Sequence, residues 1–261
     1  MVLSLVPRAL VGVIHLPALP TAPANTMPFA DIIERALQDA RTLKDGGADA
    51  CIIENFGDTP FRKDRVDPHV PTVIGLIAHQ IRQETGLIVG INILRNDARS
   101  ALGAAAAVGA DFIRVNIHSG AALTDQGVIE GQADRTLRYR QALNASVAIA
   151  ADIDVKHARA LVRRPLSEVA QETYSRAGAD ILIVSGTGTG SATNVEDLKT
   201  AREAVPHAPL WLGSGLTLEN ISHYRNLCDA FIVGTALHQR RDLSKPLDTD
   251  QVKRFKDALK N

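Results

Sequence analysis

Ionisable and amide side chains recur where short apolar runs of this 261-residue chain end. Carboxylates, imidazoles and amines can transfer protons, and amides can orient a substrate, so such a set is suited to acid–base catalysis. Nine residues stand at these positions: His15, Glu54, Asn92, Arg114, Asn116, His118, Asp152, Asp154 and Lys156. A self-satisfied polar network inside the fold is the alternative explanation for the same residues.

The residue types suggest separate roles. Glu54 and Asp152 are the best candidates for a general base, with His118 or Lys156 as the acid. Lys156 could also form a Schiff base if burial lowers its pKa, although it lies past the end of its apolar run.

Two further roles follow from charge and hydrogen bonding. Asn92 and Asn116 would orient substrate hydroxyl groups, and Arg114 or Lys156 would stabilise developing negative charge. An arginine within an apolar run needs an acidic partner, because an unpaired buried charge is very costly. Arg114 could therefore be purely structural.

A divalent metal is an open alternative. Glu54, Asp152 and Asp154 are the candidate ligands, and His15 and His118 are also suitable donors. No segment has a local metal-binding spacing such as His-Glu-x-x-His. The cofactor is thus unknown, with no nucleotide cofactor motif in the chain.

Three glycine-rich segments follow later apolar runs. Glycine lets backbone N–H groups approach an anion closely. The predicted phosphate-binding residues are Ser185, Gly186, Thr187, Gly188, Gly213, Ser214, Gly215, Gly234 and Thr235. Residues 236–239 could form a short helix beside them. The alternative is that these glycines serve only tight turns and close packing.

Internal repeats indicate which elements position these side chains. Asp49, Asp111, Asp180 and Asp229 each precede a short apolar run, three of them within Gly-Ala-Asp, which reads as a helix stop and a turn into a buried strand. Together with four intervening runs they predict eight strands, near residues 10–16, 50–54, 87–94, 112–118, 147–153, 181–185, 209–213 and 230–234.

Helical patterns fill the gaps between the predicted strands. One apolar stripe begins at Ile32 and stops at Gly46–Gly47, and another follows a cap at Asn194. Eight strand–helix units predict a single parallel (β/α)8 TIM-barrel domain over residues 1–261. An open doubly wound sheet is the alternative, but no Gly-x-Gly-x-x-Gly follows the first strand.

The strand register predicts which side chains share a layer. The fifth residue after each repeated aspartate is Glu54, Asn116, Ser185 or Gly234. These equivalent positions lie near the carboxyl ends of the strands, where such barrels hold their active sites. The loops after the seventh and eighth strands, which carry the later glycines, often bind phosphate.

Composition narrows the classes of partner. Lysine plus arginine equals aspartate plus glutamate at 29 each, and only 4% of residues are aromatic, so nothing favours nucleic acid. No apolar run is long enough to span a membrane. Cys51 and Cys228 lie in apolar runs and read as buried thiols, which favours a cytoplasmic location. A homo-oligomer is compatible with such a barrel.

Several segments together resemble the BtpA family. They are residues 11–20, 54–58, 90–97, 124–131 and 185–190, in the family's order. The resemblance implies a barrel akin to the ribulose-phosphate-binding group. It also implies an association with photosystem I biogenesis in cyanobacteria, although members occur in organisms without photosynthesis and some lie beside sugar-uptake genes. It supplies no catalytic residues.

These observations lead to one expected function and two alternatives. We expect an enzyme acting on a small phosphorylated metabolite, a sugar phosphate or a nucleotide-derived compound. Isomerisation, lyase chemistry and glycosyl-bond cleavage all suit the polar rim. The alternatives are a non-catalytic assembly factor for a membrane complex, and a sensor that binds the same ligand without turnover.

Overall fold

Eight parallel strands close into a barrel in the computed structural model, which describes residue 3 and residues 5–154, 158–186 and 193–260. Each barrel strand pairs with the ones before and after it in the chain. The barrel strands are β1 (Ala9–His15), β2 (Ala50–Glu54), β3 (Ile88–Asn92), β4 (Phe112–Val115), β7 (Ala148–Asp154), β9 (Ile181–Val184), β10 (Leu210–Leu212) and β11 (Ala230–Val233). The predicted barrel is confirmed and the open sheet is excluded.

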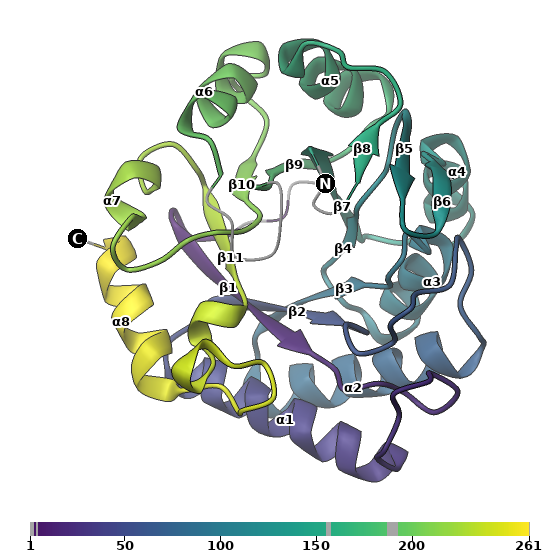
Figure 1. The fold of residues 1–261 in the computed structure, drawn as a ribbon, viewed down its shortest axis with the longest axis vertical. Helices are drawn as coiled ribbons and strands as arrows, with labels where there is room; N and C mark the ends of the chain where they lie inside the picture. The colour runs from purple at the N-terminus through teal and green to yellow at the C-terminus, as the bar shows by residue number, and fades with distance from the viewer. Residues whose placement is uncertain (1–2, 4, 155–157, 187–192, 261) are drawn as a thin grey trace.

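Helices surround the barrel (Figure 1). They are α1 (Phe29–Asp45), α2 (His69–Thr85), α3 (Ala98–Val108), α4 (Ala133–Ala142), α5 (Leu166–Gln171), α6 (Val195–Ala204), α7 (Ile221–Tyr224) and α8 (Thr249–Lys260), with a π-helical turn η1 (Glu172–Arg176) and 3-10 turns η2 (Thr235–Leu237) and η3 (Gln239–Arg241). The predicted cap of α6 is confirmed, because the Asn194 side chain accepts a hydrogen bond from the backbone N–H of Glu196.

The lower barrel interior is apolar and tightly filled. Ile52, Ile183 and Ile232 share one buried cluster inside the barrel. Gly90 leaves room for Phe112, since a Cβ added to Gly90 would lie 2.3 Å from the phenyl ring. This packing closes the barrel below the polar residues, so a ligand can enter only from the carboxyl ends of the strands.

The repeated aspartates lie at the amino-terminal end of the barrel. Each accepts a hydrogen bond from the backbone N–H at the start of the preceding barrel strand: Asp49 from Leu10, Asp111 from Val89, Asp180 from Ile149 and Asp229 from Leu210, at 2.7 to 2.8 Å. Each also pairs with a basic side chain: Lys256, Arg82, Arg140 and Arg202 respectively. The repeat therefore marks a structural device that ties neighbouring strands together.

A small antiparallel sheet interrupts the strand–helix alternation after β4. It consists of β5 (Ala121–Thr124), β6 (Gly127–Glu130) and β8 (Arg159–Ala160). The sequence predicted no strand between residues 118 and 147, whereas β5 and β6 form a hairpin there, joined by Asp125 and Gln126. Strands this short carry too few alternating residues to be recognised in a sequence.

The sequence also predicted that the two cysteines are buried and that no apolar run is long enough to span a membrane. Cys51 and Cys228 are free and buried, and burial raises the pKa of each thiol to about 12. Within the described ranges, the helices are all too short or too polar to cross a lipid bilayer.

Candidate functional site

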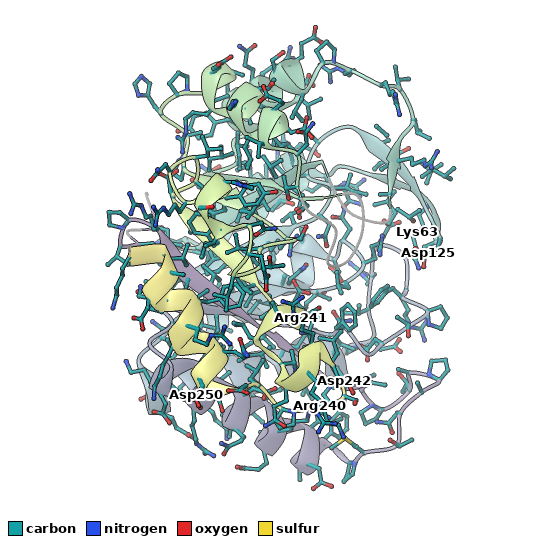
Figure 2. The ribbon with its side chains drawn as sticks, turned by 60° about the vertical axis from the view of Figure 1, so that its left-hand side comes forward. Lys63, Asp125, Arg240, Arg241, Asp242 and Asp250 are labelled. Atoms are coloured by element: carbon teal, nitrogen blue, oxygen red, sulfur yellow. The ribbon has the colours of Figure 1, made fainter. Side chains whose placement is uncertain are left out.

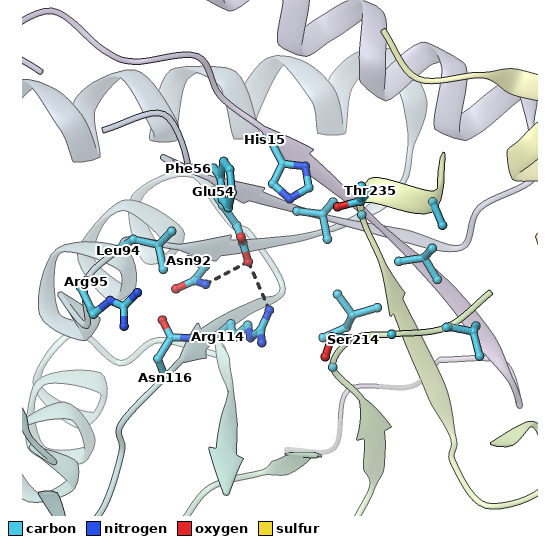
Figure 3. A pocket seen from close by; sticks show the side chains of 18 of the residues that line it. His15, Glu54, Phe56, Asn92, Leu94, Arg95, Arg114, Asn116, Ser214 and Thr235 are labelled. Atoms are coloured by element: carbon cyan, nitrogen blue, oxygen red, sulfur yellow. Dashed lines mark hydrogen bonds and ion pairs between the residues drawn. The ribbon is translucent and has the colours of Figure 1, made fainter. Parts of the chain in front are cut away.

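A pocket of about 650 Å³ opens where the barrel strands end at their carboxyl termini (Figure 3). The barrel order places β3 and β4 across the mouth from β10 and β11. Ten of the residues predicted from the sequence line this pocket: His15, Glu54, Asn92, Arg114, Asn116, Gly213, Ser214, Gly215, Gly234 and Thr235. The structure thus brings most of the predicted catalytic and phosphate-binding residues into one cavity.

Arg114 forms the floor of the pocket between two carboxylates. Its Nε and Nη2 atoms donate to the two oxygens of Asp152 at 2.9 and 3.0 Å, and Nη1 donates to Glu54 Oε1 at 3.3 Å. Burial alone would lower the pKa of Arg114, but the charges and hydrogen bonds of Asp152 and Glu54 outweigh it and raise the pKa above its ordinary value. The guanidinium is a fixed positive charge below any ligand.

Asp152 lies beneath Arg114 rather than at the pocket surface, and its side chain has no exposed area. Besides the two bonds from Arg114, its oxygens accept from Asn116 Nδ2 at 3.1 Å and from Ser185 Oγ at 2.9 Å. Four donors occupy the carboxylate. This geometry suits holding Arg114 in place better than the base role that the sequence suggested for Asp152.

Glu54 faces the pocket in a row with two other predicted residues. In the strand register His15 is opposite Glu54, and Glu54 is opposite Asn92. Asn92 Nδ2 donates to Glu54 Oε1 at 3.0 Å, which is the oxygen that Arg114 also contacts. Among the described carboxylates, Glu54 is the one at the pocket floor, and Figure 3 shows it pointing toward the cavity.

His118 does not reach the pocket. Strand β4 ends at Val115; Asn116, the next residue, still follows the inward alternation of Arg114, but His118, three residues past the strand, does not. The imidazole is buried and its Nε2 lies 2.9 Å from the carbonyl oxygen of Ala177, to which it donates. Burial lowers the pKa of His118. Its predicted role as catalytic acid has no geometric support.

The two residues that directly follow β9, Ser185 and Gly186, bind residues in and below the pocket. Ser185 binds Asp152, and the backbone N–H of Gly186 donates to Ser214 Oγ at 3.0 Å. Neither residue lines the cavity. Four predicted positions cannot be placed: Lys156, Thr187 and Gly188 lie outside the described residues, as does the side chain of Asp154 at the end of β7.

The glycines after β10 and β11 permit close packing at the opposite side of the mouth. A Cβ on Gly213 would lie 2.2 Å from Ser185 Oγ, and one on Gly234 would lie 2.6 Å from Cε1 of His15. Gly234 is followed directly by η2, at the place where a short extra helix was predicted. His15 therefore lies against the predicted anion site as well as beside Glu54.

Five pocket residues with aromatic or charged side chains escaped the sequence analysis because they lie beyond the ends of the barrel strands. They are Phe56, Phe61, Arg95, Asp125 and Arg241. Asp125 comes from the β5–β6 hairpin and Arg241 from η3, two rim segments far apart in the chain (Figure 2). The strand repeat predicts only residues within strands, so it cannot locate residues in loops. Phe56 and Arg95 follow strands β2 and β3 within a few residues, and this nearness was a usable signal for them.

Two of the three candidate metal ligands already bind a positively charged side chain. Arg114 lies between Glu54 and Asp152 and binds both. In the part of the chain that the structure describes, histidine, cysteine and carboxylate side chains form no cluster of three or more suited to a metal. The described geometry gives no support to a metal held by these two carboxylates.

The fold and pocket define a (β/α)8 barrel with a pocket at the carboxyl ends of its strands. The chain belongs to the BtpA family, whose model matches residues 6–261. It is 43% identical to the photosystem I biogenesis protein BtpA of Synechocystis sp., over 95% of this chain and 87% of that one. It is 39% identical to an uncharacterized protein of Methanocaldococcus jannaschii, over 95% and 94%.

Solved structures confirm the fold at much lower identity. N-(5'-phosphoribosyl)anthranilate isomerase from Pyrococcus furiosus superposes with a TM-score of 0.57 at 14% identity, covering 97% of this chain and 100% of that one. The likeness extends over the whole barrel, and it shows the architecture alone.

Proposed function

We propose that this protein is an enzyme acting on a small phosphorylated metabolite, a sugar phosphate or a nucleotide-derived compound, by acid–base chemistry. The observation that carries the proposal is one pocket that holds a carboxylate and a fixed arginine on its floor and glycine loops at its side. A protein with no ligand has no physical need to keep an arginine–carboxylate cluster below an open cavity.

The anion would bind beside β10 and β11. These are the seventh and eighth barrel strands, and the loops after them, with a short helix, are where many such barrels bind phosphate. Ser214, Gly215 and Thr235 line the pocket there, with Arg241 at the rim. Small side chains leave backbone N–H groups within reach of phosphate oxygens, and Arg241 adds positive charge.

The reacting group would lie over the floor. Glu54 is the proposed base, because its carboxylate faces the cavity while Asp152 is occupied by four donors. His15, next to Glu54 in the register, is the proposed acid in place of His118. Arg114 would stabilise negative charge that develops when Glu54 removes a proton, and Asn92 would orient a hydroxyl group.

The test is a panel of sugar phosphates, nucleotides and inorganic phosphate, read by the shift in unfolding temperature and by ³¹P NMR of the products. A ligand at a hundred times its dissociation constant stabilises a protein by about 2.7 kcal/mol. We expect a shift with at least one organic phosphate, and its loss in Ser214→Asp. Ser222→Asp, an exposed position on α7 away from the pocket, is the matched control. A shift that survives in Ser214→Asp would contradict the anion site.

A second candidate function rests on the name of one relative. The Synechocystis protein is called a photosystem I biogenesis protein, which favours a role in assembling a membrane complex. Such a role predicts that Glu54→Gln and Ser214→Asp leave function intact in a complementation assay. Ligand binding with no product formed by any compound of the panel would instead favour a sensor.

A further inference from the structure

The two sides of the pocket differ in chemistry. The side formed after β10 and β11 carries glycine, serine and threonine residues together with Leu216, Ala236 and Arg241, and none of its described lining residues is aromatic. The side formed after β2, β3 and β4 carries phenyl rings, a guanidinium and an amide, and the barrel order places β3 and β4 opposite β10 and β11. Figure 3 shows this separation, with Ser214 and Thr235 on one side and Arg95 and Asn116 on the other. A ligand that fills the pocket must therefore have two unlike ends.

The side after β2 and β3 offers flat apolar surfaces. Phe56 and Phe61 both come from the loop after β2, in a chain that has only six phenylalanines. The Arg95 guanidinium lies over the ring of Phe61, 5.5 Å from its centroid, and Phe56 meets the His15 ring edge-on at 4.8 Å. Phenyl faces and an arginine plane are the surfaces on which planar heterocycles stack.

The same side also offers hydrogen-bonding groups for the edge of a ring. Asn116 donates its amide to Asp152, which turns its Oδ1 atom away from that carboxylate. Within the described residues this buried Oδ1 accepts no hydrogen bond, and Asn116 lines the pocket with only 8% of its surface exposed. A buried acceptor of this kind is costly unless a ligand N–H or O–H satisfies it. Asp125 at the rim can accept as well, and Arg95 can donate.

The floor between the two sides is polar. Glu54, Asn92 and Arg114 form it, and all three can contact hydroxyl groups. The pocket thus presents, in order across its mouth, small residues suited to an anion, a polar floor suited to a hydroxylated linker, and aromatic and amide groups suited to a planar ring.

We infer that the ligand of this pocket is a nucleoside monophosphate, a compound in which a sugar joins a phosphate to a planar, hydrogen-bonding heterocycle. The inference rests on the proposed function and narrows its substrate class. A plain sugar phosphate would fill the anion side and the floor but would leave the two phenyl rings uncovered and Asn116 Oδ1 without a donor. A nucleoside monophosphate satisfies all three parts of the pocket.

The experiment measures dissociation constants by titration calorimetry for ribose 5-phosphate, for the four common ribonucleoside 5'-monophosphates and for the corresponding nucleosides. We expect at least one monophosphate to bind about tenfold more tightly than ribose 5-phosphate, the gain typical of stacking one base. Phe61→Leu should remove this gain and leave the affinity for ribose 5-phosphate unchanged, which also shows that the variant is folded. Phe29→Leu, on α1 outside the pocket, is the matched control.

The outcomes separate this inference from the proposed function. If ribose 5-phosphate binds and Ser214→Asp weakens it, but no monophosphate binds more tightly, the inference is overturned while the proposed function stands. If a monophosphate binds more tightly but Phe61→Leu keeps the gain, the ring does not lie where we place it, and the inference is likewise overturned. If nucleosides bind as tightly as their monophosphates and Ser214→Asp has no effect, the proposed phosphate site itself is wrong.

Discussion

Carboxylates at the two ends of the barrel bind different partners. At the amino-terminal end, four repeated aspartates each accept from a backbone N–H and pair with one basic side chain of the outer layer. At the carboxyl-terminal end, Glu54 and Asp152 share a single arginine on the pocket floor. Among the described residues the first arrangement occurs four times and contributes none of the residues that line the pocket, whereas the second lies at the pocket floor.

This difference separates stability from chemistry. A device that repeats around the barrel serves the fold, because it ties four of the eight neighbouring strand pairs in the same way. A cluster that occurs at one place and breaks the apolar packing of the interior has a local purpose. The general division of labour in such barrels is the same, with stability at the amino-terminal face and catalysis at the carboxyl-terminal face.

The largest expected effect tests the pocket floor. Arg114→Met leaves two buried carboxylates without their shared cation, and removing one partner of a buried ion pair typically costs about 3–5 kcal/mol. We expect a loss of that size in the free energy of unfolding, measured by urea denaturation at pH 7. A change below about 1 kcal/mol at pH 7 would show that the cluster is not a coupled unit.

A smaller effect tests the opposite end. Asp180→Asn removes the charge that Arg140 contacts and weakens the acceptor for the Ile149 N–H, and both side chains are partly exposed. We expect a loss of about 1 kcal/mol in unfolding free energy, because exposure screens the ion pair. Ligand affinity should stay within twofold of the wild type. A large loss of ligand affinity would contradict our interpretation that the amino-terminal end of the barrel serves stability alone.

The smallest effect concerns His118, to which we assign a role in stability rather than in the pocket. Because burial lowers its pKa, the unfolded chain binds a proton at a pH where the folded chain does not. Stability from this residue is present above the unfolded pKa of about 6.5 and is lost as the pH falls below it. We expect His118→Gln to flatten the fall in unfolding free energy between pH 7 and pH 5. An equal slope in both proteins would contradict the assignment.

The sequence was sufficient to predict the strands and the layer of inward side chains. The repeated aspartates set a common register, and alternation along each strand then placed Glu54, Arg114 and Asn116 together at one end. The prediction succeeded because side chains alternate along each strand. One register points the apolar residues into the lower barrel and keeps the charged residues out of it.

Alternation fails where strands end, and the remaining errors come from there. Asn116 directly follows β4 and still lines the pocket, but His118, two residues further on, turns toward Ala177. Phe61 and Arg241 reach the pocket from loops whose path depends on tertiary contacts. The roles of Glu54 and Asp152 also could not be separated, because one carboxylate becomes saturated only when Arg114, Asn116 and Ser185 converge on it.

The most direct test of the central claim compares Glu54→Gln with Asp180→Asn, measuring kcat and unfolding free energy for each. The substrate is the phosphorylated compound that the panel identifies. We predict that Glu54→Gln lowers kcat by about 10²- to 10⁴-fold, the usual contribution of a general base, with a smaller effect on stability than Arg114→Met. Asp180→Asn should lower stability and keep kcat. If Glu54→Gln instead retains kcat within a few-fold, Glu54 is not the base and the account of the pocket is wrong.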